Sequence, residues 1–219
     1  MKQTRQSADW KDGFLFLGND VVLDFLNTRP VIDTEARELI PNFKGLIQWF
    51  RAAGLVSVRD AANLQQRWAD SVRAERTVQA IRVLREKMRK EILAWERGGI
   101  VHRSAIDELN RWMARHPMRT RLQTSGKELL TQPYFVAQQP EDLLAPLAYG
   151  AAQLFSNVDR TRVRKCDHCA LHFRDTSKKG TRRWCSMRIC GNRLKVAAYA
   201  ARQRGRRERN QPRRKGSSA

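Results

Sequence analysis

The sequence predicts a mainly α fold, in which a helical N-terminal domain with one small β-hairpin precedes a small C-terminal module made of a β-hairpin and a helix. Two observations predict it. Apolar residues recur every three or four positions through most of the first 158 residues, which is the spacing of amphipathic helices. After Val158 the sequence pattern repeats at a shorter period and becomes rich in arginine. This last part holds all four cysteines. We therefore place a domain boundary at Val158.

Most helices of the N-terminal domain begin at a residue whose side chain can cap free backbone N–H groups. Asp20, Asn42, Ser57 and Ser104 each precede apolar residues at helical spacing. A short strand and a turn are expected before the first helix. Residues 119–135 alternate in polarity around a Ser-Gly pair and are expected to form the β-hairpin. The expected helices cover residues 20–26, 42–53, 57–69, 71–97, 104–116 and 140–155.

The chain is strongly basic, and the excess charge is concentrated at its C-terminal end. Its 219 residues carry 43 lysines and arginines against 22 acids, which gives a formal net charge of +21 and a pI near 11.0. Residues 160–219 hold 20 of the basic residues and 3 of the acids. A hydrophobic content of 41% and a mean hydropathy of −0.64 exclude an integral membrane protein and a wholly disordered chain. This charge favours a polyanionic partner, and nucleic acid is the first candidate.

The first residues lack the apolar stretch of a secretory signal, and no apolar run approaches the ~18 residues of a membrane helix. We therefore expect a cytoplasmic, nucleoid-associated protein with no membrane partner. Because thiols stay reduced in that compartment, four cysteines point to metal binding before they point to disulfides.

The cysteines are arranged as C-x2-C-x15-C-x4-C, formed by Cys166, Cys169, Cys185 and Cys190. A C-x2-C turn directs two thiolates at one ion, and the intervening residues are enough to return the chain with the second pair. Four soft ligands select zinc, and a site filled by four protein ligands has no open position for catalysis. We therefore expect one structural Zn²⁺ per chain. Two disulfides or an iron–sulfur cluster are the alternatives.

The rest of the C-terminal module is expected to form a small scaffold around this site. Residues 171–176 and 181–184 are expected to form two strands joined by a glycine turn, and a helix is expected to begin between Ser186 and Asn192. Trp184 is expected to pack beside the metal site rather than stack on a base. Residues 205–219 have nothing to bury and are expected to be disordered.

Basic side chains surround the cysteine cluster, and we predict that they bind nucleic acid, with DNA preferred over RNA. The predicted contacts are Arg174, Lys178, Lys179, Arg182, Arg183, Arg188, Arg193, Lys195 and Arg202.

Two segments resemble known families. The run Arg183-Trp-Cys-Ser-Met-Arg-Ile-Cys-Gly-Asn-Arg193, preceded by Cys166-x-x-Cys169 and Phe173-x-Asp175, resembles the CGNR zinc-finger family. The segment Leu23-Asp-Phe-Leu-Asn-Thr28 and the helical region after it resemble the ABATE domain of bacterial stress-induced transcriptional regulators. The resemblance implies a nucleic-acid-binding zinc module, with the four cysteines as ligands, behind a domain that senses a ligand. The expected domains are residues 1–158, the finger at 159–204 and the basic tail at 205–219.

Asp24 and Asn27 share one face of the first helix, at positions i and i+3. They are candidate binding residues for a small-molecule effector. The alternative is that Asp24 pairs with an arginine and Asn27 ends the helix. Arg82, Arg85 and Arg89 fall on one stripe of the longest helix and are expected to form a solvated face.

These observations favour a DNA-binding transcriptional regulator whose helical domain senses a small molecule, forms a homodimer or contacts other proteins. An RNA-binding protein is the nearest alternative, because basic residues alone do not distinguish the two nucleic acids. A zinc-thiolate redox switch is a further alternative, since basic neighbours lower thiolate pKa values. No nucleophile–base pair, phosphate loop or carboxylate pair has a recognisable context, so we do not expect an enzyme.

Overall fold

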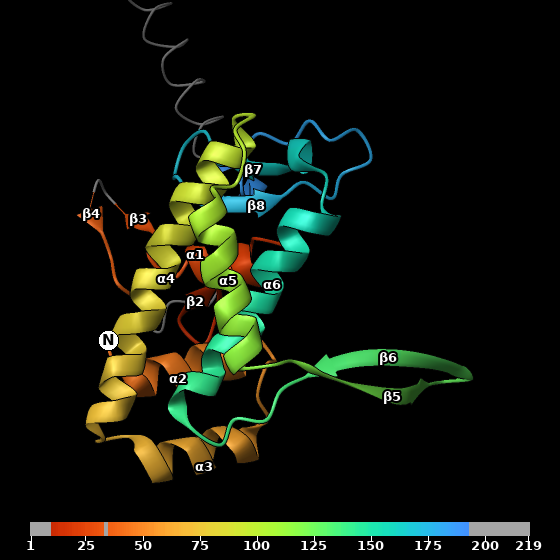
Figure 1. Cartoon of the computed structure of the whole chain (residues 1–219). Coiled ribbons are helices and arrows are strands. Elements are labelled where there is room, and N and C mark those ends of the chain that lie inside the picture. The colour runs from red at the N-terminus through yellow and green to blue at the C-terminus, as the bar shows by residue number, and fades with distance from the viewer. Residues whose placement is uncertain (1–9, 33–34, 193–219) are drawn as a thin grey trace, which may run out of the picture.

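The computed structural model describes residues 10–32 and 35–192, and its fold is mainly helical, as predicted (Figure 1). The helices are α1 (Val21–Leu26), α2 (Phe43–Ala52), α3 (Val58–Trp68), α4 (Val72–Glu96), α5 (Arg103–Arg115) and α6 (Leu144–Asn157). Shorter turns of 3-10 or π helix are η1 (Pro140–Leu143), η2 (Arg160–Arg162) and η3 (Met187–Gly191). Antiparallel hairpins pair β1 (Trp10–Lys11) with β2 (Phe14–Leu15), β3 (Val31–Ile32) with β4 (Glu35–Ala36), β5 (Arg119–Ser125) with β6 (Glu128–Tyr134), and β7 (Val163–Lys165) with β8 (His172–Arg174). No helix within the described ranges is long and apolar enough to cross a membrane.

Local capping starts most helices where the sequence predicts. In each case a side-chain oxygen of the cap accepts a backbone N–H two or three residues further on, which contributes about 1 kcal/mol. The caps are Asp20, Asn42, Ser57 and Ser71. α5 is an exception, because it begins at Arg103, ahead of the expected Ser104 cap. The Glu91 carboxylate on α4 accepts the N–H of His102 at 2.9 Å. A side chain of the neighbouring helix therefore replaces the expected cap at the start of α5.

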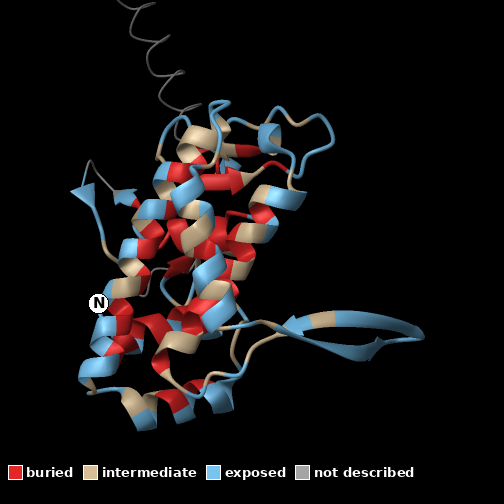
Figure 2. Cartoon of the chain, in the orientation of Figure 1, coloured by how far each residue is buried: buried red, intermediate tan, exposed pale blue. Residues whose placement is uncertain are grey.

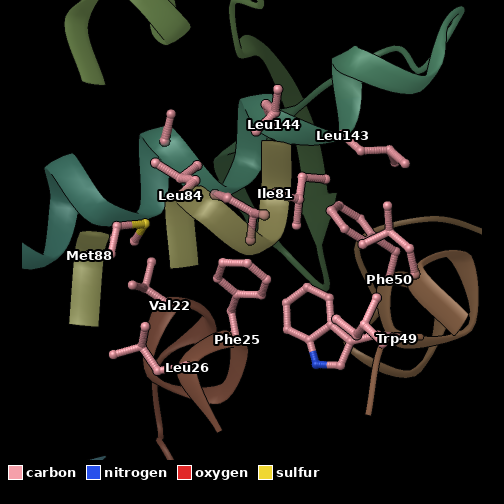
Figure 3. Packing of buried hydrophobic residues seen from close by; sticks show 14 of the residues in the cluster. Val22, Phe25, Leu26, Trp49, Phe50, Ile81, Leu84, Met88, Leu143 and Leu144 are labelled. Atoms are coloured by element: carbon pink, nitrogen blue, oxygen red, sulfur yellow. The ribbon is translucent and has the colours of Figure 1, made fainter. Parts of the chain in front are cut away.

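α1 lies at the centre of the main hydrophobic core, against α4 and α6. Its residues Val22, Leu23, Phe25 and Leu26 are fully buried. Figure 3 shows Phe25 beside Trp49, with ring centroids 5.5 Å apart. Burying one such aromatic side chain contributes about 1.5–3 kcal/mol. Because a helix of 6 residues is unstable alone, burial rather than helix propensity holds α1 in place.

The predicted hairpin of β5 and β6 projects from the helical body as an arm (Figure 1). Its turn contains Gly126, whose φ of +63° suits glycine. Figure 2 shows that the arm is almost wholly exposed, whereas the buried residues gather between the helices of the body.

A second, smaller core joins the N-terminal hairpin to the cysteine module. Leu15 and Leu17 pack there with Leu171, Phe173 and three of the cysteines, and Trp10 and Trp184 cover the cluster. The segment that precedes α1 is therefore packed against the C-terminal module.

The strand pairing predicted inside the cysteine module is wrong. β8 pairs with β7, which precedes the first cysteine pair, and residues 181–184 form no strand. The cause is Asp175, whose carboxylate accepts the N–H groups of Ser177 at 2.9 Å and Arg182 at 2.8 Å. The backbone N–H groups of this loop therefore bind a carboxylate instead of pairing with β8 as a second strand. β7 pairs with β8 in place of the expected strand, and Val163, fully buried in the main core, anchors β7 there.

The helix expected from Ser186 begins with a π-helical turn that the Ser186 side chain caps. Its continuation and the basic tail at 205–219 lie outside the described residues.

Candidate metal centre and its basic surroundings

The fold brings the four predicted ligands together. Cys166 and Cys169 lie on the turn between β7 and β8, Cys185 lies before η3, and Cys190 lies within η3. Their sulfurs all lie within 4.8 Å of one another, with 3.4 Å between Cys169 and Cys185 and 3.6 Å between Cys185 and Cys190. Tetrahedral bonds of about 2.3 Å to one ion place sulfurs ~3.8 Å apart, whereas a disulfide needs ~2.05 Å. The arrangement fits one four-coordinate metal ion.

Without a cation, the four neighbouring thiols do not all ionise together. Hydrogen bonds from the thiols of Cys169 and Cys185, with backbone N–H groups of Cys185 and His168, lower the pKa of Cys166. The bond to Cys166 in turn raises the pKa of Cys185, and burial raises the pKa of Cys190 to about 12. The thiols alone thus favour one thiolate among protonated neighbours. Four adjacent thiolates become favourable when a divalent ion neutralises them.

Arg182, one of the predicted nucleic-acid contacts, instead braces the loop that carries Cys185. Its guanidinium lies 4.6 Å from the ring centroid of Phe173 and donates to the backbone carbonyls of Trp184 and Cys185. Its backbone N–H is held by Asp175. Burial opposes the charge of Asp175, but hydrogen bonds from Ser177 and Arg182 outweigh it and hold the pKa of this carboxyl below its ordinary value.

Other predicted contacts lie open on the surface of the module. Lys178 and Lys179 on the loop after β8 and Arg188 in η3 are exposed. Arg174 is half-buried in β8, where its backbone N–H donates to the carbonyl of Gly18 at 2.7 Å. The remaining three, Arg193, Lys195 and Arg202, lie outside the described residues.

Arg183 is exposed but already has a partner. Its guanidinium donates to Asp167 at 2.8 Å and lies 5.8 Å from the ring centroid of Trp184. Trp184 is half-buried and packs on the cysteine core, as predicted. A nucleic acid that bound Arg183 would have to compete with Asp167.

Within the described residues, Asp24 has no arginine partner. Its carboxylate accepts the N–H of Gly18 at 2.6 Å and that of Leu17, and it folds this loop back on the start of α1. Burial raises the pKa of Asp24 to about 6. Gly18 has no room for a side chain, because a Cβ there would lie 2.7 Å from the N atom of Asp24 and 2.8 Å from the Cβ of Leu23.

Asn27 caps the C-terminal end of α1 and also joins the helical body to the cysteine module. Its amide donates to the carbonyl of His172 at 2.9 Å and accepts the N–H of His172 at 2.9 Å. Both residues are 1% exposed. A further link runs from the N–H of Lys165 to Glu96 at 2.8 Å. Asn27 therefore lies at a joint between the helical body and the cysteine module, and Asp24 holds the loop before α1.

His172, a histidine beside the cysteine cluster, is buried at this joint. Neither of its ring nitrogens has a hydrogen-bond partner among the described residues. Burial, with Arg89 and Lys165 nearby, lowers the pKa of His172 to about 3. The imidazole is therefore neutral and packs as part of the buried core. The backbone of His172 makes the two hydrogen bonds to Asn27.

The arginine stripe of α4 is not a solvated face, contrary to prediction. Arg85 is 1% exposed, pairs with Glu38 and donates to the hydroxyl of Thr28 at 2.8 Å. Arg82 and Arg89 donate to backbone carbonyls, those of Ile40 and Leu26. The stripe binds a carbonyl at the end of α1 and a carbonyl and a carboxylate of the segment that follows it, which periodicity alone does not reveal.

Two family models match the chain. The ABATE model, described as "Putative stress-induced transcription regulator", matches residues 19–157, which is more than half of the chain. The model described as "CGNR zinc finger" matches residues 162–203. No curated protein matches the chain.

Proposed function

Because the chain belongs to the ABATE family and carries a CGNR zinc finger, we propose that it is a zinc-dependent, DNA-binding regulator of transcription. Zinc folds the finger, exposed basic side chains of the finger hold DNA, and the helical domain carries the regulatory input. The observation that carries this proposal is the convergence of four cysteine sulfurs within 4.8 Å beside exposed lysine and arginine side chains.

The donor set supports zinc as the metal. Four thiolates at near-tetrahedral spacing suit Zn²⁺, whereas harder cations prefer oxygen ligands. An iron–sulfur cluster needs room for several iron and sulfide atoms between the thiolates, and the sulfurs here converge within 4.8 Å. When bound, zinc supplies a four-way cross-link and leaves no open coordination position. This supports a structural role for the ion and a protein that binds rather than catalyses.

Lys178, Lys179 and Arg188 are the described side chains best placed to bind phosphates. All three are exposed, and none is paired with a carboxylate in the described part of the chain. Arg182, by contrast, is engaged by backbone carbonyls. Residues 193–219 add ten basic residues and one acid to the same end of the chain. The family description supports DNA over RNA and therefore action at the nucleoid in the cytoplasm.

A salt titration with matched charge variants tests this proposal. The zinc-loaded full chain would be compared with a finger variant, Lys178→Gln/Lys179→Gln/Arg188→Gln, on duplex DNA and on RNA. The control is Arg59→Gln/Arg76→Gln/Lys127→Gln, which removes three exposed basic residues from the helical body and the arm. Each lost phosphate contact lowers the magnitude of the log–log salt slope by about 0.9, so the finger variant should lose up to about 2.7.

The control should keep the slope of the unmodified chain, because its charges lie away from the finger. Equal losses in the two variants would contradict a finger-centred DNA interface. Tighter binding to RNA than to DNA at every salt concentration would replace the proposal by an RNA-binding one.

A further inference from the structure

A hollow of about 830 Å³ lies between α3 and the base of the β5–β6 arm. One face of α3, the residues on either side of the arm and the start of α6 line it. Ligand pockets in proteins are commonly about 300–1,000 Å³, so the hollow has room for a small molecule. Figure 1 shows α3 and the arm far from β7 and β8, so the hollow is separate from the metal centre.

The inner wall of the hollow is apolar, and the main core holds it in place. Leu64 of α3 is 2% exposed, and Pro146 of α6 is buried. Phe135, which follows β6, packs edge-on against Phe50 with ring centroids 6.4 Å apart. Leu64 and Phe50 belong to the main core, and Phe135 packs against it. The wall is therefore formed before any ligand arrives, which lowers the entropy cost of binding.

Two arginines at the rim of the hollow have only neutral partners among the described residues. Arg67 donates to the carbonyl of Gln138 at 3.3 Å, and Arg121 donates to the side chain of Gln132 at 2.8 Å. Each guanidinium has five N–H donors, so most of these donors remain for a ligand. Both guanidinium charges are therefore available to an anion.

The acidic side chain that lines the hollow is already engaged. The carboxylate of Asp60 accepts the hydroxyl of Ser57 at 2.7 Å, at the start of α3. Its single negative charge leaves the lining with a net positive charge, because both arginines line the same hollow. A cationic ligand would meet this positive charge. A highly charged ligand such as a sugar phosphate would leave the apolar wall uncovered.

We propose that the hollow binds a small organic anion with a carboxylate on a planar, apolar body. Arg67 and Arg121 hold the carboxylate, because a guanidinium pairs with a carboxylate through two parallel hydrogen bonds. The planar body lies against Phe135 and Leu64. Such a ligand would give the helical domain its regulatory input, and this consequence alone rests on the proposed function.

Isothermal titration calorimetry of the zinc-loaded full chain with 2-naphthoate tests the site without DNA. This probe joins a carboxylate to a planar two-ring body, and 2-naphthalenemethanol has the same rings without the charge. We expect 2-naphthoate to bind with a stoichiometry of one and the alcohol to bind at least about tenfold more weakly. Arg67→Gln/Arg121→Gln should weaken the binding of 2-naphthoate by a similar factor.

Two matched pairs of variants locate the binding. Arg59→Gln/Arg76→Gln removes the same total charge outside the hollow and should keep the affinity. Asn63→Trp fills the hollow and should abolish binding, whereas Gln66→Trp lies on the same helix outside the lining and should not. All of these side chains are exposed, so each variant should keep the melting temperature of the unmodified chain.

No binding of 2-naphthoate at ~5 mM would overturn the proposal, as would equal affinity for the alcohol. Equal losses in the two arginine variants, or unchanged binding in Asn63→Trp, would also overturn it. Since no nucleic acid is present, these outcomes leave the DNA-binding proposal to its own test.

Discussion

Replacing Asn27 by leucine probes the joint between the helical body and the zinc finger. The substitution keeps the size of the side chain but removes both hydrogen bonds to the backbone of His172, each 2.9 Å long. It leaves the N–H and the carbonyl of His172 without their partner at a position where the residue is 1% exposed. Water cannot easily replace the lost amide there.

Each buried backbone group left unsatisfied costs about 1–3 kcal/mol, so the two together should lower the free energy of unfolding by about 4 kcal/mol. That is a large share of the roughly 5–15 kcal/mol that stabilises a typical domain. Because β8 follows the first cysteine pair directly, the same loss should make the finger release zinc more readily.

Urea unfolding of the zinc-loaded chain, followed by circular dichroism and by transfer of zinc to a coloured chelator, measures both effects. Asn19→Gly is the control, since it removes a 3.0 Å hydrogen bond to Arg174 on the same strand at an exposed site. Glycine also suits the φ of +53° at this position. The control should cost less than about 1 kcal/mol. An Asn27→Leu variant within about 1 kcal/mol of the unmodified chain would refute the joint, and so would an equal loss in the control.

Three further predictions follow from the same region. Gly18→Ala should lower the melting temperature, at a cost of about 2–3 kcal/mol, because its Cβ would meet the N atom of Asp24 at 2.7 Å; an unchanged melting curve would contradict this. Burial raises the pKa of Asp24 from 3.8 to about 6, so the folded chain binds a proton between these values that the unfolded chain does not. The free energy of unfolding of the unmodified chain, relative to that of Asp24→Asn, should therefore rise by about 1 kcal/mol as the pH falls from 7 to 5. A fall in this difference, measured by urea titration, would contradict a raised pKa for Asp24. Arg182→Gln should speed zinc loss to a chelator because it frees two carbonyls beside the metal site, whereas Lys178→Gln should not; equal rates would return Arg182 to the list of nucleic-acid contacts.

The starts of the helices were predictable because the deciding interactions are local. Asn42, Ser57 and Ser71 each cap a backbone group within three residues, and the sequence shows both partners at once. The grouping of the cysteines was predictable for a similar reason, since the x2 and x4 spacings restrict where the sulfurs can point.

The C-cap role of Asn27 was predicted, but its joint with the cysteine module and the partners of the arginine stripe were not predictable, because these partners are distant in the chain. Asn27 binds a residue 145 positions away, and Arg85 binds Glu38 across 47 positions. The partner of β8 was not predicted because β8 has only three residues. A strand this short can pair either with the segment before it or with the segment after it. Asp175 was part of the motif that resembled the finger family, but the motif did not show that this carboxylate closes the loop.

We propose that zinc held by four cysteines creates the DNA-binding form of this protein. The most direct measurement pairs native mass spectrometry of the full chain with DNA binding before and after chelation, with Cys185→Ser measured alongside. We expect one zinc per chain, loss of DNA binding beyond weak electrostatic attraction on chelation, recovery on adding zinc, and failure of Cys185→Ser to hold the ion. DNA binding with the same affinity and salt slope in the zinc-free chain, or full zinc content in Cys185→Ser, would contradict it.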